Sequence, residues 1–171
     1  MYKIESIKDY LQDKDLYKLI DEIYLVTEPI CKYYPNHKEW FYNIHLPKCI
    51  KDINNYTILF VRNSDNEIIG VACLRYENKE RKICSLYISE NHRNKGIGTK
   101  LLEESMKWLK TTKPFITITK DNIKYYENFI KKYDWELKEI QPGFYNKEYT
   151  EYCYNYTITE SYEEDKKNTN Y

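Results

Sequence analysis

The segment of residues 81–109 constrains the fold more than any other part of the chain, because its apolar pattern changes there from that of a strand to that of a helix. Residues 81–89 are rich in apolar residues and predict a β-strand. Residues 91–98 are polar and hold two of the four glycines in the chain. From Ile97 to Leu109, apolar residues recur at helical spacing. We therefore expect a strand, a glycine-containing loop and an amphipathic helix in direct succession.

The same two patterns divide the rest of the chain into strands and helices. Runs rich in β-branched and aromatic residues predict strands at 2–6, 56–61, 68–76, 115–119, 135–140 and 149–158. Turn residues separate the runs between 56 and 89, which predicts an antiparallel meander. Helical spacing predicts helices at 7–24, capped by Ser6 or Asp9, at 36–53 with an interruption at Pro47, and at 121–133, capped by Asp121 or Asn122.

The chain shows neither an internal repeat nor a linker, so its organisation is predicted to be simple. We expect one α+β domain over residues 1–159 and a polar, disordered tail over residues 160–171.

Charge and hydropathy exclude several classes of partner. Lys+Arg and Asp+Glu both number 27, so the net charge is zero, whereas a protein that binds nucleic acid through phosphates is basic overall or in one block. No stretch approaches the roughly 18 apolar residues of a membrane span. The charged residues 1–10 lack the apolar run of a signal peptide. We therefore expect no nucleic-acid partner and no membrane partner.

The cysteines favour a reducing compartment. There are five of them, Cys31, Cys49, Cys73, Cys84 and Cys153, and none forms a Cys-x-x-Cys pair. An odd number at wide spacing argues against a disulfide framework and against a zinc site. We expect free thiols, no metal site and a cytoplasmic protein.

The loop before the helix at 97–109 has the chemistry of an anion site. Helix N-termini present N–H groups without intrahelical partners, and glycine lets a ligand approach that backbone closely. Arg93 and Lys95 add positive charge, so a diphosphate is a suitable ligand. The alternative is an ordinary loop in which glycine satisfies a turn. A Walker A motif does not fit, because Thr99 and Lys100 follow Gly98 in the reverse order, and a dinucleotide fingerprint would need a third glycine where Leu101 stands.

The pattern that does fit is Arg-x-x-Gly-x-Gly at residues 93–98. With Leu86-Tyr87-Ile88 before it and Leu101-Leu102 after it, this segment resembles the coenzyme A loop of the GNAT superfamily of N-acetyltransferases. The expected order of elements is similar to that fold as well. The resemblance implies a mixed, mostly antiparallel sheet flanked by helices, with splayed central strands. It also implies acetyl-CoA as the co-substrate and direct acetyl transfer to a primary amine on a small molecule or a peptide.

The resemblance further implies which residues bind the cofactor. The strand edge at 86–88 would pair with the pantetheine amides, and the backbone from Asn94 to Thr99 would hold the pyrophosphate, with Arg93 supporting the loop or a phosphate. Asn122 fits a further family position after the next strand. The implied cofactor-binding residues are Leu86, Tyr87, Ile88, Arg93, Asn94, Lys95, Gly96, Ile97, Gly98, Thr99 and Asn122.

The general acid is the first catalytic group to assign. The family's tyrosine position falls on Ile130, and Tyr126 lies one turn earlier on the same helix face. A Tyr126 hydroxyl could protonate the departing thiolate. Tyr125 is the adjacent alternative, and simple packing of Tyr126 against the sheet is another.

The general base stays open. Where the family often carries a Glu, this chain has Cys84 and Ser85, and neither is a good base. Other candidates would act through water or from the acceptor side of the site, and each also has an ordinary structural explanation: Glu39, Glu77, Glu80, His37 and His45. In the resemblance, residues 29–47 wall the acceptor pocket.

Two functions therefore follow from the sequence. The first is an N-acetyltransferase, as a monomer or a homodimer, and the second is a non-catalytic acyl-CoA-binding or regulatory protein on the same fold. Neither the acceptor amine nor the general base is identified by the sequence.

Overall fold

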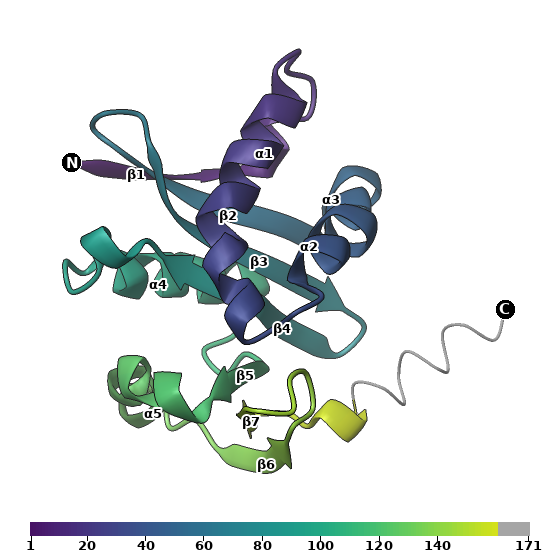
Figure 1. Cartoon of the computed structure of the whole chain (residues 1–171), viewed down its shortest axis with the longest axis vertical. Coiled ribbons are helices and arrows are strands. Elements are labelled where there is room, and N and C mark those ends of the chain that lie inside the picture. Colours follow the sequence, from purple (N-terminus) through teal and green to yellow (C-terminus); the bar gives the residue numbers. More distant parts are fainter. Residues whose placement is uncertain (161–171) are drawn as a thin grey trace, which may run out of the picture.

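A four-stranded antiparallel sheet forms the N-terminal part of the fold. The computed structural model describes residues 1–160 (Figure 1). Strands β1 (Tyr2–Ser6), β2 (Tyr56–Asn63), β3 (Ile68–Glu77) and β4 (Glu80–Ile88) lie side by side in sequence order. The predicted meander is therefore confirmed, with strand ends that differ by one or two residues.

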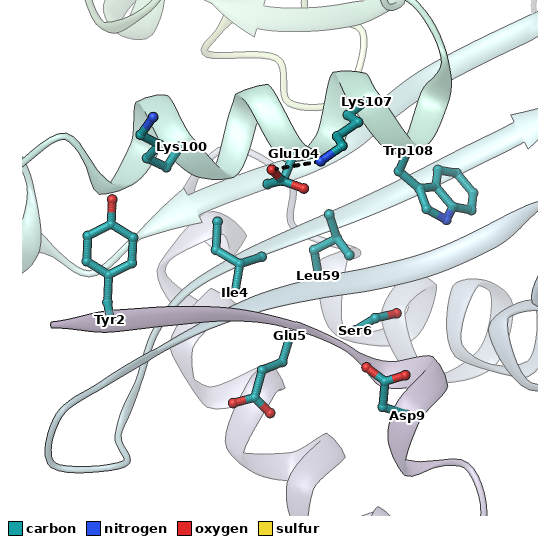
Figure 2. A pocket seen from close by; sticks show the side chains of 10 residues that line it. All are labelled: Tyr2, Ile4, Glu5, Ser6, Asp9, Leu59, Lys100, Glu104, Lys107 and Trp108. Atoms are coloured by element: carbon teal, nitrogen blue, oxygen red, sulfur yellow. Dashed lines mark ion pairs between the residues drawn. The ribbon is translucent and has the colours of Figure 1, made fainter.

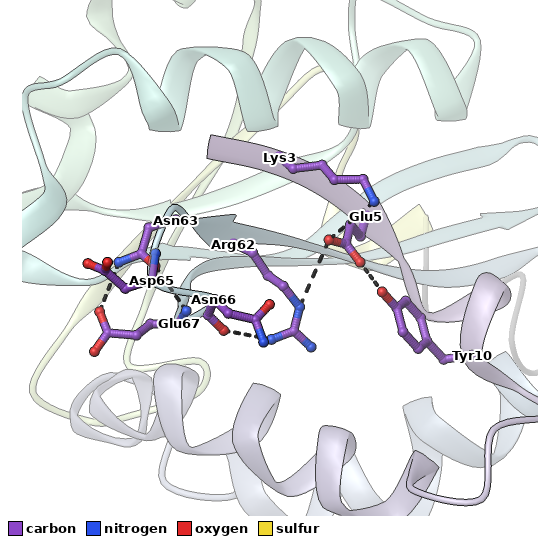
Figure 3. A network of polar contacts seen from close by, with 8 residues as sticks. All are labelled: Lys3, Glu5, Tyr10, Arg62, Asn63, Asp65, Asn66 and Glu67. Carbon is purple, nitrogen blue, oxygen red and sulfur yellow. Dashed lines mark hydrogen bonds and ion pairs between the residues drawn. The ribbon is translucent and has the colours of Figure 1, made fainter. Parts of the chain in front are cut away.

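The outer edge of this sheet is held by a polar network between β1 and β2 (Figure 3). Glu5 is nearly buried and accepts a hydrogen bond from the Tyr10 hydroxyl. Arg62 Nε lies 3.9 Å from Glu5 Oε1, and its Nη1 donates to Asn66 O at 2.9 Å. The network thus ties the first strand to the turn between β2 and β3.

Helices cover both faces of the sheet (Figure 1). Helix α1 (Leu16–Thr27) packs on one face together with α2 (His37–Trp40) and α3 (Leu46–Lys51). Helix α4 (Ile97–Leu109) packs on the other face. Successive apolar side chains along β2 and β3 point alternately into the core under α4 and into the core under α1, as expected for strands that are buried on two sides.

Two predicted helices are less regular than expected. The helix predicted from residue 7 is a 3-10 turn at Ile7–Tyr10, whose first residue follows Ser6, and α1 starts only at Leu16. The break predicted at Pro47 is instead a π-helical turn at Phe41–His45, in which the Leu46 amide donates to Phe41 O. Pro47 sits at the start of α3, where its missing N–H needs no intrahelical partner.

A second sheet forms the C-terminal part and is only loosely joined to the first. It comprises β5 (Ile116–Thr119), β7 (Thr150–Tyr154) and β6 (Leu137–Pro142), with β7 in the middle. Within the described residues, β4 and β5 share one bridge, at Lys82 and Phe115, where two backbone hydrogen bonds of 2.8 and 3.0 Å form. Beyond that bridge the two strands run unpaired. The prediction of an α+β fold with splayed central strands is confirmed.

The helix predicted at 121–133 is broken. A 3-10 segment, Lys120–Tyr125, is followed by α5 (Glu127–Lys132), and Tyr126 lies at the junction with φ −109°. The expected caps, Asp121 and Asn122, do not cap it, because Thr119 precedes the first turn and Asn122 Nδ2 donates to Thr119 Oγ1 at 2.8 Å.

The described chain ends in helical residues, 158–160. The Glu160 carboxylate accepts hydrogen bonds from the Thr157 amide and hydroxyl at 3.0 and 2.8 Å. The rest of the tail predicted at 160–171 lies outside the described residues. Of the helices within residues 1–160, none has the length and apolar character needed to cross a membrane.

Candidate functional site

The loop between β4 and α4 presents an exposed backbone to solvent. Asn94 and Gly96 both have left-handed conformations, with φ 60° and 76°. Gly96 is the residue before α4, so the amides of Ile97, Gly98 and Thr99 start the helix without intrahelical acceptors. Asn94, Lys95, Gly96 and Thr99 are exposed. This turn thus places N–H groups without intrahelical partners at the positive end of a 13-residue helix, which is suited to an anion.

Arg93 links this loop to both halves of the protein. Its Nε donates to Ile88 O at 3.0 Å, at the end of β4. Its guanidinium lies 5.2 Å from the centre of the Tyr87 ring and 5.9 Å from that of Tyr125. Arg93 therefore supports the loop, one of the two roles expected for it, and places positive charge between β4 and the segment after β5. Lys95 Nζ donates to Asn91 O at 3.0 Å, which leaves it on the loop surface.

The β4 edge and β5 form the two sides of the splay. Leu86 and Tyr87 are half-buried, and Ile88 is buried against α4. Their edge has no β5 partner, because pairing ends at the Lys82–Phe115 bridge. A pantetheine arm fits such an edge, since its amides can pair with unpartnered backbone groups. Asn122 lies beyond the end of β5, bonded to Thr119.

Tyr126 faces the same region as Arg93. Burial raises the pKa of Tyr126 to about 12, while the charge of Arg93 acts to lower it. The phenol is therefore protonated at neutral pH. Tyr126 and Ile130 both pack against the core under α4, whereas Tyr125 is 51% exposed. The Ile130 amide donates to Tyr126 O at 2.9 Å, so the two residues are one helical turn apart as expected.

Most sequence candidates for the base are occupied elsewhere. Glu80 is ion-paired with Arg75, and Glu77 accepts a hydrogen bond from the Tyr56 hydroxyl. Glu39 is exposed on α2. Cys84 is half-buried, and burial raises the pKa of its thiol, which opposes a nucleophilic role.

Both histidine candidates are neutral core residues. Burial lowers the pKa of His37 and of His45 to about 4. His37 Nε2 lies 2.8 Å from Thr27 Oγ1, whose own hydrogen goes to Tyr24 O, so the histidine is the donor. His45 Nε2 donates to Thr57 O at 3.2 Å. Their geometry is that of packing and hydrogen bonding within the N-terminal core.

A buried carboxylate that the sequence did not single out lies beside the splay. Glu151 on β7 is 1% exposed, pairs in register with Thr119 of β5, and accepts a hydrogen bond from the Tyr34 hydroxyl at 3.1 Å. Thr117 also hydrogen-bonds to it. Burial raises the pKa of Glu151 to about 7, against the opposing effects of these hydrogen bonds and of the Lys82 charge. A carboxyl that titrates near neutral pH in a polar cluster is typical of acid–base sites.

The segment before α2 and the β6–β7 hairpin close over Glu151. The Tyr34 ring contacts that of Tyr145 with 5.0 Å between centres, and Tyr33 contacts Tyr149 at 4.8 Å. Asn146 Nδ2 donates to Lys32 O at 3.0 Å. The residues predicted to wall an acceptor pocket are thus divided: Tyr33 and Tyr34 face the hairpin, and the histidines turn into the core.

One sequence signal could have found Glu151. The strand predicted at 149–158 alternates, so Glu151 shares a face with Cys153, while Tyr152 and Tyr154 take the opposite, core-facing side. A single carboxylate on a strand face that also carries a buried thiol is out of place unless it has partners. Its actual partners come from Tyr34 and Thr117, which lie far away in sequence.

A groove of 630 Å³ lies elsewhere, between β1 and α4 (Figure 2). Its lining carries both signs of charge, including Lys107 and Glu104 of α4, which form an ion pair of 3.6 Å. None of the residues predicted to bind the cofactor lines it. The groove is therefore separate from the loop and the splay.

Comparison with known proteins identifies the family of the chain. The model of the Acetyltransferase (GNAT) family matches residues 14–129. Among curated proteins, none matches this chain in sequence. A solved GNAT-family protein from Desulfovibrio desulfuricans is 13% identical, with TM-score 0.64, over 90% of this chain and 97% of that one. The ribosomal-protein-S18-alanine N-acetyltransferase from Escherichia coli is 12% identical, with TM-score 0.59, over 90% and 92%.

A further match is shorter. A protein assigned as a streptothricin acetyltransferase from Bacillus anthracis, solved in complex with acetyl coenzyme A, is 19% identical with TM-score 0.49. The match covers 58% of this chain and 61% of that one, less than two thirds of its length. The fold of the longer matches and the family model covering most of the described residues lead to one conclusion. The chain belongs to the GNAT family of acetyltransferases, whose co-substrate is acetyl-CoA.

Proposed function

We propose that this protein transfers the acetyl group of acetyl-CoA directly to a primary amine, in the cytoplasm. The observation that carries the proposal is that the splay is continuous with the loop. Strand β4 diverges from β5 after the Lys82–Phe115 bridge, and its end leads into the loop whose amides start α4. One extended ligand can place its pyrophosphate on the loop and its thioester between the strands. The free thiols of Cys31, Cys49, Cys73, Cys84 and Cys153 support a reducing compartment.

The reaction needs the protein mainly to position the amine and the thioester and to transfer protons. Holding an amine against a thioester is worth several kcal/mol of barrier. The amine nitrogen attacks the carbonyl carbon, the C–S bond breaks, and the sulfur takes up a proton. We propose Tyr126 as the donor of that proton, since its pKa of about 12 keeps it protonated near Arg93.

Turnover across a set of amines tests the proposal. Acetyl-CoA should bind the protein in calorimetry, and thiol release should rise when ethanolamine, tyramine, spermidine or a peptide with a free N-terminus is added. Tight binding of acetyl-CoA without turnover of any primary amine would favour the non-catalytic alternative. Absence of binding would reject both.

A further inference from the structure

We infer that Glu151 accepts the proton that the acceptor ammonium must lose, and that the Tyr34 hydroxyl hands this proton over. The inference rests on the proposed amine acetylation and names the group that the reaction still lacks. An alkyl ammonium holds its proton at neutral pH, since its pKa is roughly 10, so the attacking amine needs an acceptor.

The position of Glu151 carries the inference. Its strand, β7, pairs with the edge of β5 that lies away from β4, and Glu151 stands opposite Thr119 on the sheet face that also carries Thr117. Lys82 of β4 also acts on this carboxylate, so Glu151 lies within electrostatic reach of the other side of the splay. The Tyr34 hydroxyl donates to it at 3.1 Å and comes from residues 29–47, the segment expected to wall the acceptor pocket. No other carboxylate discussed above is both buried and free of an ion-pair partner on the side of the splay.

The proton transfer balances in atoms and charge. An ammonium hydrogen moves onto the Tyr34 oxygen while the Tyr34 hydrogen moves to Glu151, which gives a neutral amine and a carboxylic acid. The amine forms the C–N bond and the C–S bond breaks. Tyr126 gives its proton to the thiolate and is reprotonated by one of the two hydrogens still on the nitrogen, while the other hydrogen stays on the amide. Glu151 then releases its proton to solvent, so that the net products are an amide, free coenzyme A and one proton.

The charged and titratable groups around Glu151 set the pH at which this can work. Lys82 on β4 is the nearby cation, and it acts to lower the pKa of Glu151. The phenols and thiols that bear on the cluster are neutral at pH 7, since burial raises the pKa of each: Tyr34, Tyr145, Cys84 and Cys153. The Glu139 carboxylate on β6, which stands opposite Cys153 and acts to raise the pKa of its thiol, is a further charged group beside the cluster. Below about pH 7 Glu151 is protonated and cannot accept, so kcat/KM should fall as pH decreases through that value.

The experiment is a pH profile of kcat/KM for whichever primary amine of the four-member set the wild type turns over. The wild type should reach a plateau above about pH 7. Glu151→Gln should lower kcat/KM at pH 7 by about 10²–10⁴-fold and replace the plateau by a rise that continues toward the pKa of the amine. Glu139→Gln, on neighbouring β6, is the matched control and should keep the wild-type profile, because the Glu139 carboxylate bonds the Ile158 amide instead.

Lys82→Met gives a second readout that does not depend on the stability of the Glu151 variant. Loss of the cation should raise the pKa of Glu151 and move the acidic limb up by about one pH unit. A Glu151→Gln enzyme with an unchanged plateau, or a Lys82→Met enzyme with an unmoved limb, would overturn the inference while leaving amine acetylation standing. A wild type that turns over no amine would reject the proposed function, and the role of Glu151 with it.

Discussion

At the scale of single residues, the candidate site combines a residue that sequence spacing points to with a residue whose role depends on a distant partner. Tyr126 could be proposed because helical spacing places it one turn from Ile130, and that relation is present in the structure. The pattern of its strand could place Glu151 on a buried face but could not give it a role, because its hydrogen-bond partner Tyr34 lies 117 residues earlier in the chain. Local pattern reports which face a residue occupies, but it does not report which distant side chain will meet it there.

Removal of the Tyr126 hydroxyl should slow catalysis without weakening cofactor binding. Tyr126→Phe keeps the ring in the core and removes only the donor. We expect turnover of the acceptor amine to fall by about 10², the lower end for general acid catalysis, because a phenol with a pKa near 12 is a weak acid. Acetyl-CoA affinity, measured by calorimetry, should be unchanged.

Tyr125 provides the matched control. It is the neighbouring tyrosine, it is 51% exposed, and Tyr125→Phe should keep wild-type turnover. If Tyr126→Phe also keeps full turnover under conditions where chemistry limits the rate, Tyr126 is a packing residue and solvent protonates the thiolate.

At the scale of elements, the periodicity of apolar residues predicts the regular strands and helices, but it does not predict local breaks within a helix. The meander of β2, β3 and β4 follows from alternation and turn residues, both of which are local. The break at Tyr126 does not, since residues 121–133 keep helical spacing although the backbone changes from 3-10 to α-helix. The π-turn before Pro47 is not predicted for the same reason, because a helix can accommodate one extra residue without losing its apolar face.

The start of α4 should be the element on which cofactor affinity depends. A Cβ at Gly98 would lie 3.5 Å from Ile88 Cγ1, an ordinary contact, so Gly98→Val should fold. Its side chain would obstruct the helix N-terminus, and each hydrogen bond lost to a charged phosphate is worth about 1.5–3 kcal/mol. We expect acetyl-CoA affinity to fall by at least about tenfold.

A second glycine in the same loop separates steric from conformational effects. Gly96 has φ +76° with nothing within 4 Å of a Cβ position, so Gly96→Asn should hold the turn, because Asn tolerates this conformation. Calorimetry on folded protein is the measurement for both variants. Wild-type affinity in Gly98→Val would place the pyrophosphate elsewhere.

At the scale of the whole molecule, burial of titratable groups sets how stability depends on pH. His37 and His45 have folded pKa values of about 4 against 6.5, so the unfolded chain binds more protons between these values. Stability is therefore lost as pH falls through that window. Glu151 acts in the opposite sense: its pKa is about 7 against 4.5, so the folded protein binds the extra proton, and stability is gained as pH falls from 7.

The two effects predict a measurable slope and its sign. Two histidines opposed by one carboxyl leave about one proton, so the free energy of unfolding in urea should fall by roughly 1.4 kcal/mol per pH unit between about pH 6 and 5. Glu151→Gln removes the opposing group and should steepen this fall. A slope that becomes shallower in Glu151→Gln would show that Glu151 is ionised in the folded protein at these pH values.

The central place of β7 in the second sheet has a consequence for how the protein is made. Strands β5 and β6 do not pair with each other through their backbones, and both pair with β7, the last strand in the described part of the chain, which lies between them. During synthesis the meander of β2, β3 and β4 can form from neighbouring segments as each emerges, whereas the second sheet must wait for residue 154. The nascent chain thus has an early-folding half that carries the loop and a late half that carries Glu151. Catalytic competence should therefore appear in one step, once β7 has emerged and paired.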